Sequence, residues 1–200
     1  MRIFAERRLS EVLEAQRQAM LKELQNEQRN ILLNVNESDY VKYLAGKYHI
    51  EPISIHFDAL HCSEAEKMIP TEQHPFDSGC HYSAVKKAAY PRQVFTFHLP
   101  FGGEADLLKC QPSSHLVWST EVAVSAQEIR FDLINWRNDI EEIKREQNGI
   151  VDNIRQQNES VRADVEHFNS HSEEQAGRGF AGLSTHTSLH SLSKHDGRDL

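Results

Sequence analysis

The residue types best suited to metal binding gather in one segment of the chain. Cys62, His74, Cys80 and His81 supply zinc-ligand atoms, and His61 is adjacent to the first of them. Zinc knuckles usually place paired ligands about two to four residues apart, and this segment has no Cys-x-x-Cys or His-x-x-x-His pair. The residue types permit a structural metal, but their spacing does not predict one, so metal binding by these four residues stays open.

Nucleophilic catalysis would require a thiol or hydroxyl activated by a positioned base. Cys110 with His98 or His115 has the right types, but such types are too abundant to be informative. Because Cys110 follows the apolar pair Leu107 and Leu108, we expect a buried structural thiol instead. We therefore assign no catalytic, cofactor-binding or metal residue, expect no cofactor, and favour a non-enzymatic function.

The letters from Gly177 to Gly182 match the glycine-rich fingerprint of dinucleotide-binding proteins. That fingerprint needs a strand before it and a helix after it, whereas this one follows a predicted helix. We interpret the match as chance composition. We likewise assign no native role to His186, His190 and His195, because any flexible histidine-rich segment can bind metal adventitiously.

Length and composition bound the class of protein. The chain has 200 residues, enough for one domain with a helical arm, and its net charge of -8 argues against a nucleic-acid backbone as the main ligand. The mean hydropathy of -0.61 predicts a modest core that gains from a partner. No apolar run is long enough to span a membrane, and Met1–Arg8 lacks the apolar core of a signal sequence. The three cysteines are odd in number and irregularly spaced, which does not suit a disulfide framework. These features favour a cytoplasmic protein with reduced thiols and no membrane partner.

Two helices are predicted before any strand. Apolar residues recur at helical spacing from about Phe4 to Leu33, which predicts a helical arm over residues 1–35. A shorter helix is expected to start with Ser38 as its N-cap and to end between Gly46 and Pro52.

A period of two then predicts a small antiparallel sheet within an α+β domain, residues 36–135. Alternating apolar residues indicate strands at Ile53–Phe57 and Phe95–Leu99, and a hairpin from Val122–Val124 and Ile129–Leu133. The intervening segment His61–Pro91 holds proline and glycine with little periodicity, so a long loop is expected there.

The last ordered element is predicted to be a long charged helix over residues 136–169. Its heptad seam is apolar but interrupted by polar residues. The seam could join another subunit or the first helix of the same chain, or it could lie on the chain's own sheet. We expect a contact with a helical partner or a second copy, and we expect lysine at two seam positions to abolish self-association while the sheet stays folded. The candidate contact residues are Ile140, Ile143, Ile150, Ile154 and Val161.

Composition changes abruptly near Asn169, where charged periodic sequence gives way to glycine, serine and histidine. This predicts a disordered tail over residues 170–200. A shifted reading frame near Ser170 and an ordinary chain end are two explanations that both stay open.

The stretch from Tyr90 to Leu108, followed by Gln111-Pro112-Ser113, contains a strand, a Pro-Phe-x-Gly-acid turn, a leucine pair and a Pro-Ser stop. With the hairpin and long charged helix after it, it resembles the N-terminal region of uncharacterised bacterial proteins that carry this motif. The resemblance covers about residues 30 to 170, implies no known activity and transfers no catalytic residue. Phe101 is expected to insert into the core, and Gly102 and Gly103 to form a tight turn.

These observations favour a non-catalytic assembly or regulatory module that acts through helix-mediated protein contact. The alternative is the N-terminal sensor or adaptor part of a larger bacterial effector, such as a hydrolase or nuclease, whose C-terminal domain is absent. The expected partners are a second copy or a helical protein, without nucleic acid or membrane.

Overall fold

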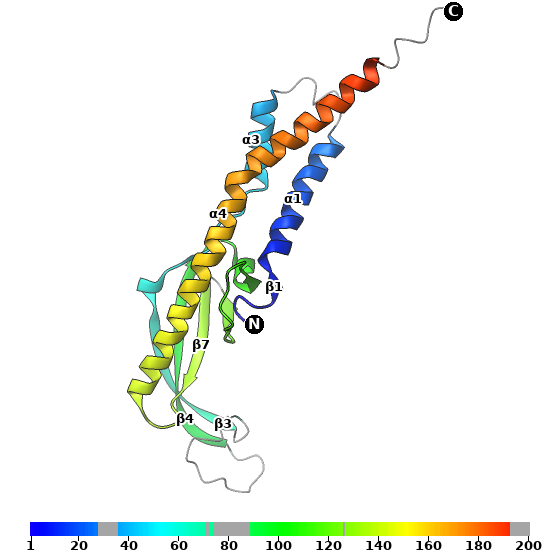
Figure 1. Ribbon diagram of the computed structural model, residues 1–200. Coiled ribbons are helices and arrows are strands. Elements are labelled where there is room, and N and C mark those ends of the chain that lie inside the picture. Colours follow the sequence, from blue (N-terminus) through cyan, green and yellow to red (C-terminus); the bar gives the residue numbers. More distant parts are fainter. Residues whose placement is uncertain (28–35, 71–72, 74–88, 126, 193–200) are drawn as a thin grey trace, which may run out of the picture.

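The computed structural model describes residues 1–27, 36–70, 73, 89–125 and 127–192, with side chains as far as Gly182. A small antiparallel sheet packs against one half of a long C-terminal helix, and two shorter helices pack against the other half (Figure 1). The expected α+β class is confirmed. The last eight residues, 193–200, lie outside the described part of the chain.

The sheet is organised around one long strand. β4 (Ala89–Gly102) pairs antiparallel with β2 (Ser54–Ile55), β3 (His61–Pro70) and β7 (Glu128–Ile134), and β7 also pairs with β6 (Ala123–Ser125). The predicted hairpin is confirmed. The predicted strand Ile53–Phe57 is shorter than expected, because a 3₁₀ turn begins at Phe57 and ends at Ala59.

The prediction of a loop over His61–Pro91 is wrong over its described ends, where β3 and the start of β4 lie. All side chains of β3 except Ile69 are exposed. An edge strand with both faces in solvent has no alternating apolar residues, so the sequence pattern misses it. Most of the remaining segment lies outside the described residues.

The long helix α4 (Ile140–Leu192) starts at a capped N-terminus. Asp139 Oδ1 accepts hydrogen bonds from the backbone N–H groups of Glu141, at 2.9 Å, and Glu142, at 3.2 Å. Asn135 Oδ1 in turn accepts from the Asp139 N–H, at 2.9 Å. The helix therefore begins four residues after the predicted Trp136, directly after the capping residue Asp139.

One stripe of α4 and the inner face of the sheet form the main core. The stripe includes Ile143, Ile154, Val161 and Phe168, and it packs with sheet residues that alternate along β4 and β7. Phe101 is 3% exposed and Cys110 is 0% exposed, so the predicted core insertion and the predicted buried thiol are both confirmed. The sheet members of this core include Phe97, Leu99, Phe101, Ile129, Phe131 and Leu133.

The helix does not end at the predicted boundary near Asn169. It continues beyond that residue, and Ser172, Ala176 and Phe180 are buried on the side of α4 that faces the other two helices. Asn169 itself is a packing residue, because its Nδ2 donates to the Ile50 carbonyl oxygen at 2.8 Å. The change in composition near Asn169 is therefore not accompanied by a change in secondary structure. Small residues suit this part of α4 because it packs closely against α1.

The other two helices are α1 (Leu9–Asn26) and α3 (Glu37–Lys47). Helix α1 starts later than the predicted Phe4, because Phe4 has a positive φ of 53° and lies in an extended N-terminal segment. That segment leads into β1 (Arg7–Arg8), which pairs in parallel with β5 (Cys110–Gln111). Asn36, not Ser38, caps α3, since its Oδ1 accepts from the Ser38 N–H. None of the helices in the described ranges is long and apolar enough to cross a membrane.

A three-residue polar contact joins α1 to α3 and gives a pH-dependent prediction. Glu23 accepts hydrogen bonds from Lys47 Nζ, at 2.6 Å, and from the Tyr48 hydroxyl, at 2.7 Å, and these bonds lower the pKa of its carboxyl. A lowered folded pKa stabilises the fold above the unfolded value of about 4.3, and that stabilisation is lost as the pH falls through the folded value. We expect Glu23→Gln to lower the free energy of unfolding by about 0.2 to 1 kcal/mol at pH 7.

Urea denaturation of wild type and Glu23→Gln at pH 7 and pH 3 measures this contribution. The difference should shrink at pH 3, and Lys47→Gln should reproduce most of it at pH 7. A difference that is unchanged at pH 3 would contradict the assignment to the ionised carboxyl.

Candidate functional site

The predicted seam residues lie mainly inside the chain's own core. Ile154 and Val161 are 0% exposed, Ile143 is 5% exposed and Ile150 is half-buried against the same cluster. Only Ile140, at 42%, presents a largely exposed side chain. Of the alternatives for the seam, the structure therefore has packing within the chain itself, on the sheet and on α1. A seam contact with another chain would have to displace these elements.

Of the four candidate metal ligands, the structure describes only Cys62; His74, Cys80 and His81 lie outside the described residues. Cys62 lies on the exposed edge strand β3, and burial, with the nearby Glu64, raises the pKa of its thiol. A raised pKa leaves little thiolate at neutral pH, so Cys62 is a poor nucleophile.

A different group of chemically competent side chains comes together on the outer face of the sheet. We call His61, Ser63, His98 and Glu128 the polar cluster. In the register, His61 is opposite His98, Ser63 is opposite Thr96, and Glu128 is opposite the residue two positions after His98. Because alternate residues share one face of a sheet, all four members lie on the same face of β3, β4 and β7.

Hydrogen bonds connect the polar cluster in a row. His98 Nε2 lies 3.0 Å from Ser63 Oγ, and His98 Nδ1 lies 3.0 Å from Glu128 Oε2. The His61 ring stacks on the His98 ring with centroids 4.8 Å apart and planes 7° apart. The hydrogen bond from His98 lowers the pKa of the Glu128 carboxyl, and Arg130, whose Nε lies 3.6 Å from that carboxyl, acts in the same direction.

The Ser63–His98–Glu128 order is that of a hydroxyl, a base and a carboxylate that orients the base. Catalysis by such a row also needs a cavity that binds the substrate beside the hydroxyl. Neither of the two described cavities includes a member of the polar cluster. We therefore interpret the row as hydrogen-bonded side chains on a solvent-facing surface. Their nitrogen and oxygen atoms remain accessible to a ligand from solvent.

Sequence reasoning missed the polar cluster. From the sequence alone, His98 is paired only with Cys110, as its possible base. In the structure His98 hydrogen-bonds to Ser63 and Glu128 on the outer face, whereas Cys110 is buried and its Sγ donates to the Asp106 carbonyl oxygen at 3.4 Å. A signal for the cluster was present in the alternation of Phe97, His98 and Leu99, which places His98 on the face opposite the core. The partner strand β3 could not be aligned with it from pattern alone.

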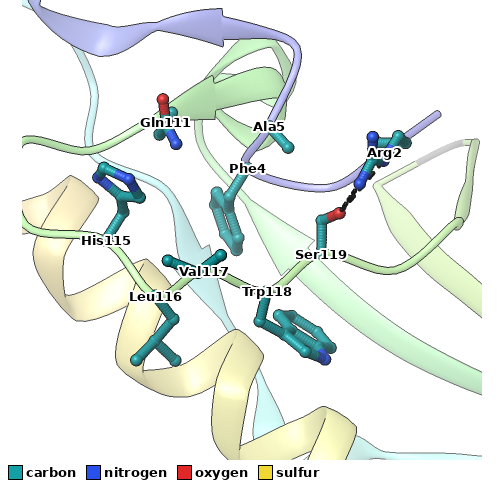
Figure 2. A pocket seen from close by; sticks show the side chains of 9 residues that line it. All are labelled: Arg2, Phe4, Ala5, Gln111, His115, Leu116, Val117, Trp118 and Ser119. Carbon is teal, nitrogen blue, oxygen red and sulfur yellow. Dashed lines mark hydrogen bonds between the residues drawn. The ribbon is translucent and has the colours of Figure 1, made fainter.

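A separate cavity of about 450 Å³ lies between the N-terminal segment and the loop His115–Ser119, which we call the 115–119 loop (Figure 2). Figure 2 shows Phe4 pointing toward this loop, while Leu116 and Trp118 point toward α4. Val117 between them is fully exposed, with a relative exposure of 105%. The other lining residues are Arg2, Ala5, Gln111, His115 and Ser119.

A second cavity, of about 410 Å³, lies between the start of α3 and α4. It is next to Gly177, a residue of the glycine-rich letters that resemble a dinucleotide fingerprint. Those letters lie inside α4 with no strand before them. Gly179 faces α1, where an added Cβ would lie 2.9 Å from Leu24 Cδ2. Gly179 therefore serves helix packing, and none of these glycines forms a phosphate-binding turn.

The fold and these sites define an α+β chain in which one long helix packs against both the sheet and the two shorter helices. Comparison with known proteins adds no family to that description: no family model, no curated protein and no solved structure matches the chain. The functional argument below therefore depends on the described residues alone.

Proposed function

We propose that the chain is a cytoplasmic, non-catalytic assembly or regulatory module that pairs with a second copy of itself through the 115–119 loop. The observation that supports this most directly is the fully exposed Val117, next to the half-buried Leu116 and Trp118. Consecutive apolar residues on a surface loop are unfavourable in an isolated chain, and they commonly indicate a contact surface.

The loop is held in place, so Val117 is not exposed through disorder of its surroundings. Gln157 Nε2 donates to the Trp118 carbonyl oxygen at 3.3 Å, and Ser113 donates from its N–H and hydroxyl to Asp164, at 2.8 and 2.7 Å. Gln157 and Asp164 both lie on α4, so these hydrogen bonds hold the loop and the segment before it against that helix. A partner would therefore meet a preformed surface and would lose little entropy in ordering it.

Charges around the cavity suit pairing between identical surfaces. Arg2 donates through its side chain to Ser119 Oγ at 2.6 Å, and Glu6 Oε1 accepts from the Arg2 backbone N–H at 3.0 Å. Glu121 is opposite Arg2 in an isolated β-bridge. A twofold contact brings each patch against its own copy, so a rim that contains both a cation and carboxylates can match itself.

Sedimentation velocity over a concentration series tests the proposal. We expect an average mass above 23.0 kDa that rises with concentration, and Val117→Asp should raise the dissociation constant at least about tenfold, since burying a valine contributes about 1.5 kcal/mol or more. Ile140→Asp is the matched control, because it also places a carboxylate at an exposed aliphatic position. A chain that stays monomeric, or dimers unaffected by Val117→Asp, would overturn self-association through this loop.

The alternative function, an N-terminal sensor or adaptor part of a larger effector, stays a prediction. Its strongest motive was the change in composition near Asn169. Because Ser172, Ala176 and Phe180 pack inside the fold, the residues immediately after Asn169 fit the helix before them. The composition change therefore does not mark a structural break at Ser170, and both explanations of it stay open.

A further inference from the structure

We propose that His61, His98 and Glu128 form a binding site for a divalent transition-metal cation of the Zn²⁺ class. One ligand atom from each residue can be chosen so that all three lie within 4.8 Å of one another. Two imidazoles and a carboxylate are a donor set that zinc and its neighbours accept, and three protein ligands leave a position open for water or another ligand.

The contact between His98 and Glu128 already has dimensions close to those of two ligands on one ion. His98 Nδ1 and Glu128 Oε2 lie 3.0 Å apart, and two ligands of a tetrahedral zinc with bonds of about 2.0 Å lie roughly 3.3 Å apart. A cation can therefore replace the proton that these atoms share with little movement of either strand. His98 Nε2 would keep its hydrogen bond to Ser63 Oγ, and such an outer partner commonly orients a metal-binding imidazole.

His61 supplies the third ligand from the edge strand. Its Nδ1 lies 3.3 Å from the Ala59 carbonyl oxygen, which suits a protonated Nδ1 and leaves the Nε2 lone pair for a metal. The side chain is exposed, so its ring is free to leave the parallel stack on His98 and turn toward the ion. The bound ion would then link β3 to β4 and β7, whereas in the described part of the chain β3 pairs with β4 alone.

Arg130 sets a limit on the affinity. Its Nε lies 3.6 Å from Glu128 Oε2, while its Nη2 donates to Ser125 Oγ at 3.0 Å. A cation at the site must share the Glu128 carboxylate with this guanidinium. We therefore expect reversible binding that is weaker than that of a closed four-ligand zinc site.

Another histidine pair must be separated from the proposed site in any test. His167 and His171 are four residues apart on α4, and their ring centroids lie 4.2 Å apart. Both side chains are exposed, and an exposed pair at this spacing is a common adventitious metal ligand. It provides the matched control, because His171→Ala also removes one imidazole but on a different element from His61→Ala.

The test is a Zn²⁺ titration of the full chain, first dialysed against a chelator, in competition with a chromophoric chelator. We expect His61→Ala and Glu128→Gln each to weaken the tightest site at least about tenfold, and His171→Ala to leave it unchanged. In parallel, ¹⁵N-detected histidine side-chain spectra should show the His61 and His98 signals shifting first. Circular dichroism checks that both variants keep the wild-type fold.

Three results would overturn the proposal. Wild type could fail to retain Zn²⁺, the His61→Ala and Glu128→Gln variants could bind it as wild type does, or the affinity could fall only in His171→Ala. The last result would assign the metal to the helix pair as an adventitious site.

Discussion

Replacing Ile154 with lysine should unfold the chain, not merely separate its copies. Ile154 is 0% exposed and lies where α4 meets the inner face of the sheet. Truncation to alanine there should cost about 2 to 5 kcal/mol. Lysine adds an unpaired buried charge, and the total should exceed about 5 kcal/mol, which is comparable with the whole stability of many domains. Loss of the cooperative urea transition, followed by circular dichroism, is the measurement.

Ile140→Lys is the control for this experiment. Ile140 belongs to the same predicted seam but is 42% exposed, so we expect a change within about 0.5 kcal/mol. The sequence pattern alone led us to expect that lysine at Ile150 and Ile154 would abolish self-association and leave the sheet folded. A folded, monomeric Ile154→Lys variant would restore that expectation and contradict the packing of α4 on the sheet.

Replacing Gly103 with alanine should produce the second large effect, by about 2 to 4 kcal/mol of lost stability. Gly103 has a φ of +87°, and an added Cβ would lie 2.5 Å from the carbonyl oxygen of Pro52 and 3.1 Å from Ile53 Cα. Both obstacles are backbone atoms, so no side-chain rotation relieves them. The measurement is again the free energy of unfolding in urea.

Gly102→Ala is a control one residue away. An added Cβ at Gly102 meets nothing within 4 Å, so we expect a change below about 1 kcal/mol. Equal losses at the two positions would show that the effect comes from general glycine flexibility and not from the approach of the Pro52 backbone. This contrast also gives a physical reason for the second glycine of the Pro-Phe-Gly-Gly sequence, because that glycine lets the backbone at Pro52, just before β2, approach the end of β4.

The functional proposals depend on surfaces that are separate in sequence and in the fold. The 115–119 loop lies against α4 and the N-terminal segment, whereas the polar cluster lies on the outer face of the sheet. Self-association can therefore fail while zinc binding succeeds, and the reverse is equally informative. The charged side chains of β3, among them Glu64, Glu66 and Lys67, also suit an edge strand that must not pair with other chains.

Local patterns by themselves determined the α+β class, the β6–β7 hairpin, the strand Phe95–Leu99 within β4, and the buried Cys110. These features depend on alternation, glycine and proline, which act over a few residues and can be read in one segment at a time. The tight turn predicted at Gly102 and Gly103 is not what the structure has, because Gly102 still pairs with Ser54 as the last residue of β4 and the chain bends only at Gly103.

Tertiary structure decided where those elements meet. Strand β3 exists because β4 completes its backbone hydrogen bonds, although its own side chains show no strand pattern. The apolar seam of α4 could pack against any apolar surface, and only the three-dimensional arrangement shows that Ile154 and Val161 are buried by other elements of the same chain. His61, His98 and Glu128 come from three strands, so their proximity follows from register, which no single segment encodes. Hydrophobic burial is non-directional. A sequence pattern therefore shows that a face is buried, but it does not show which element covers that face.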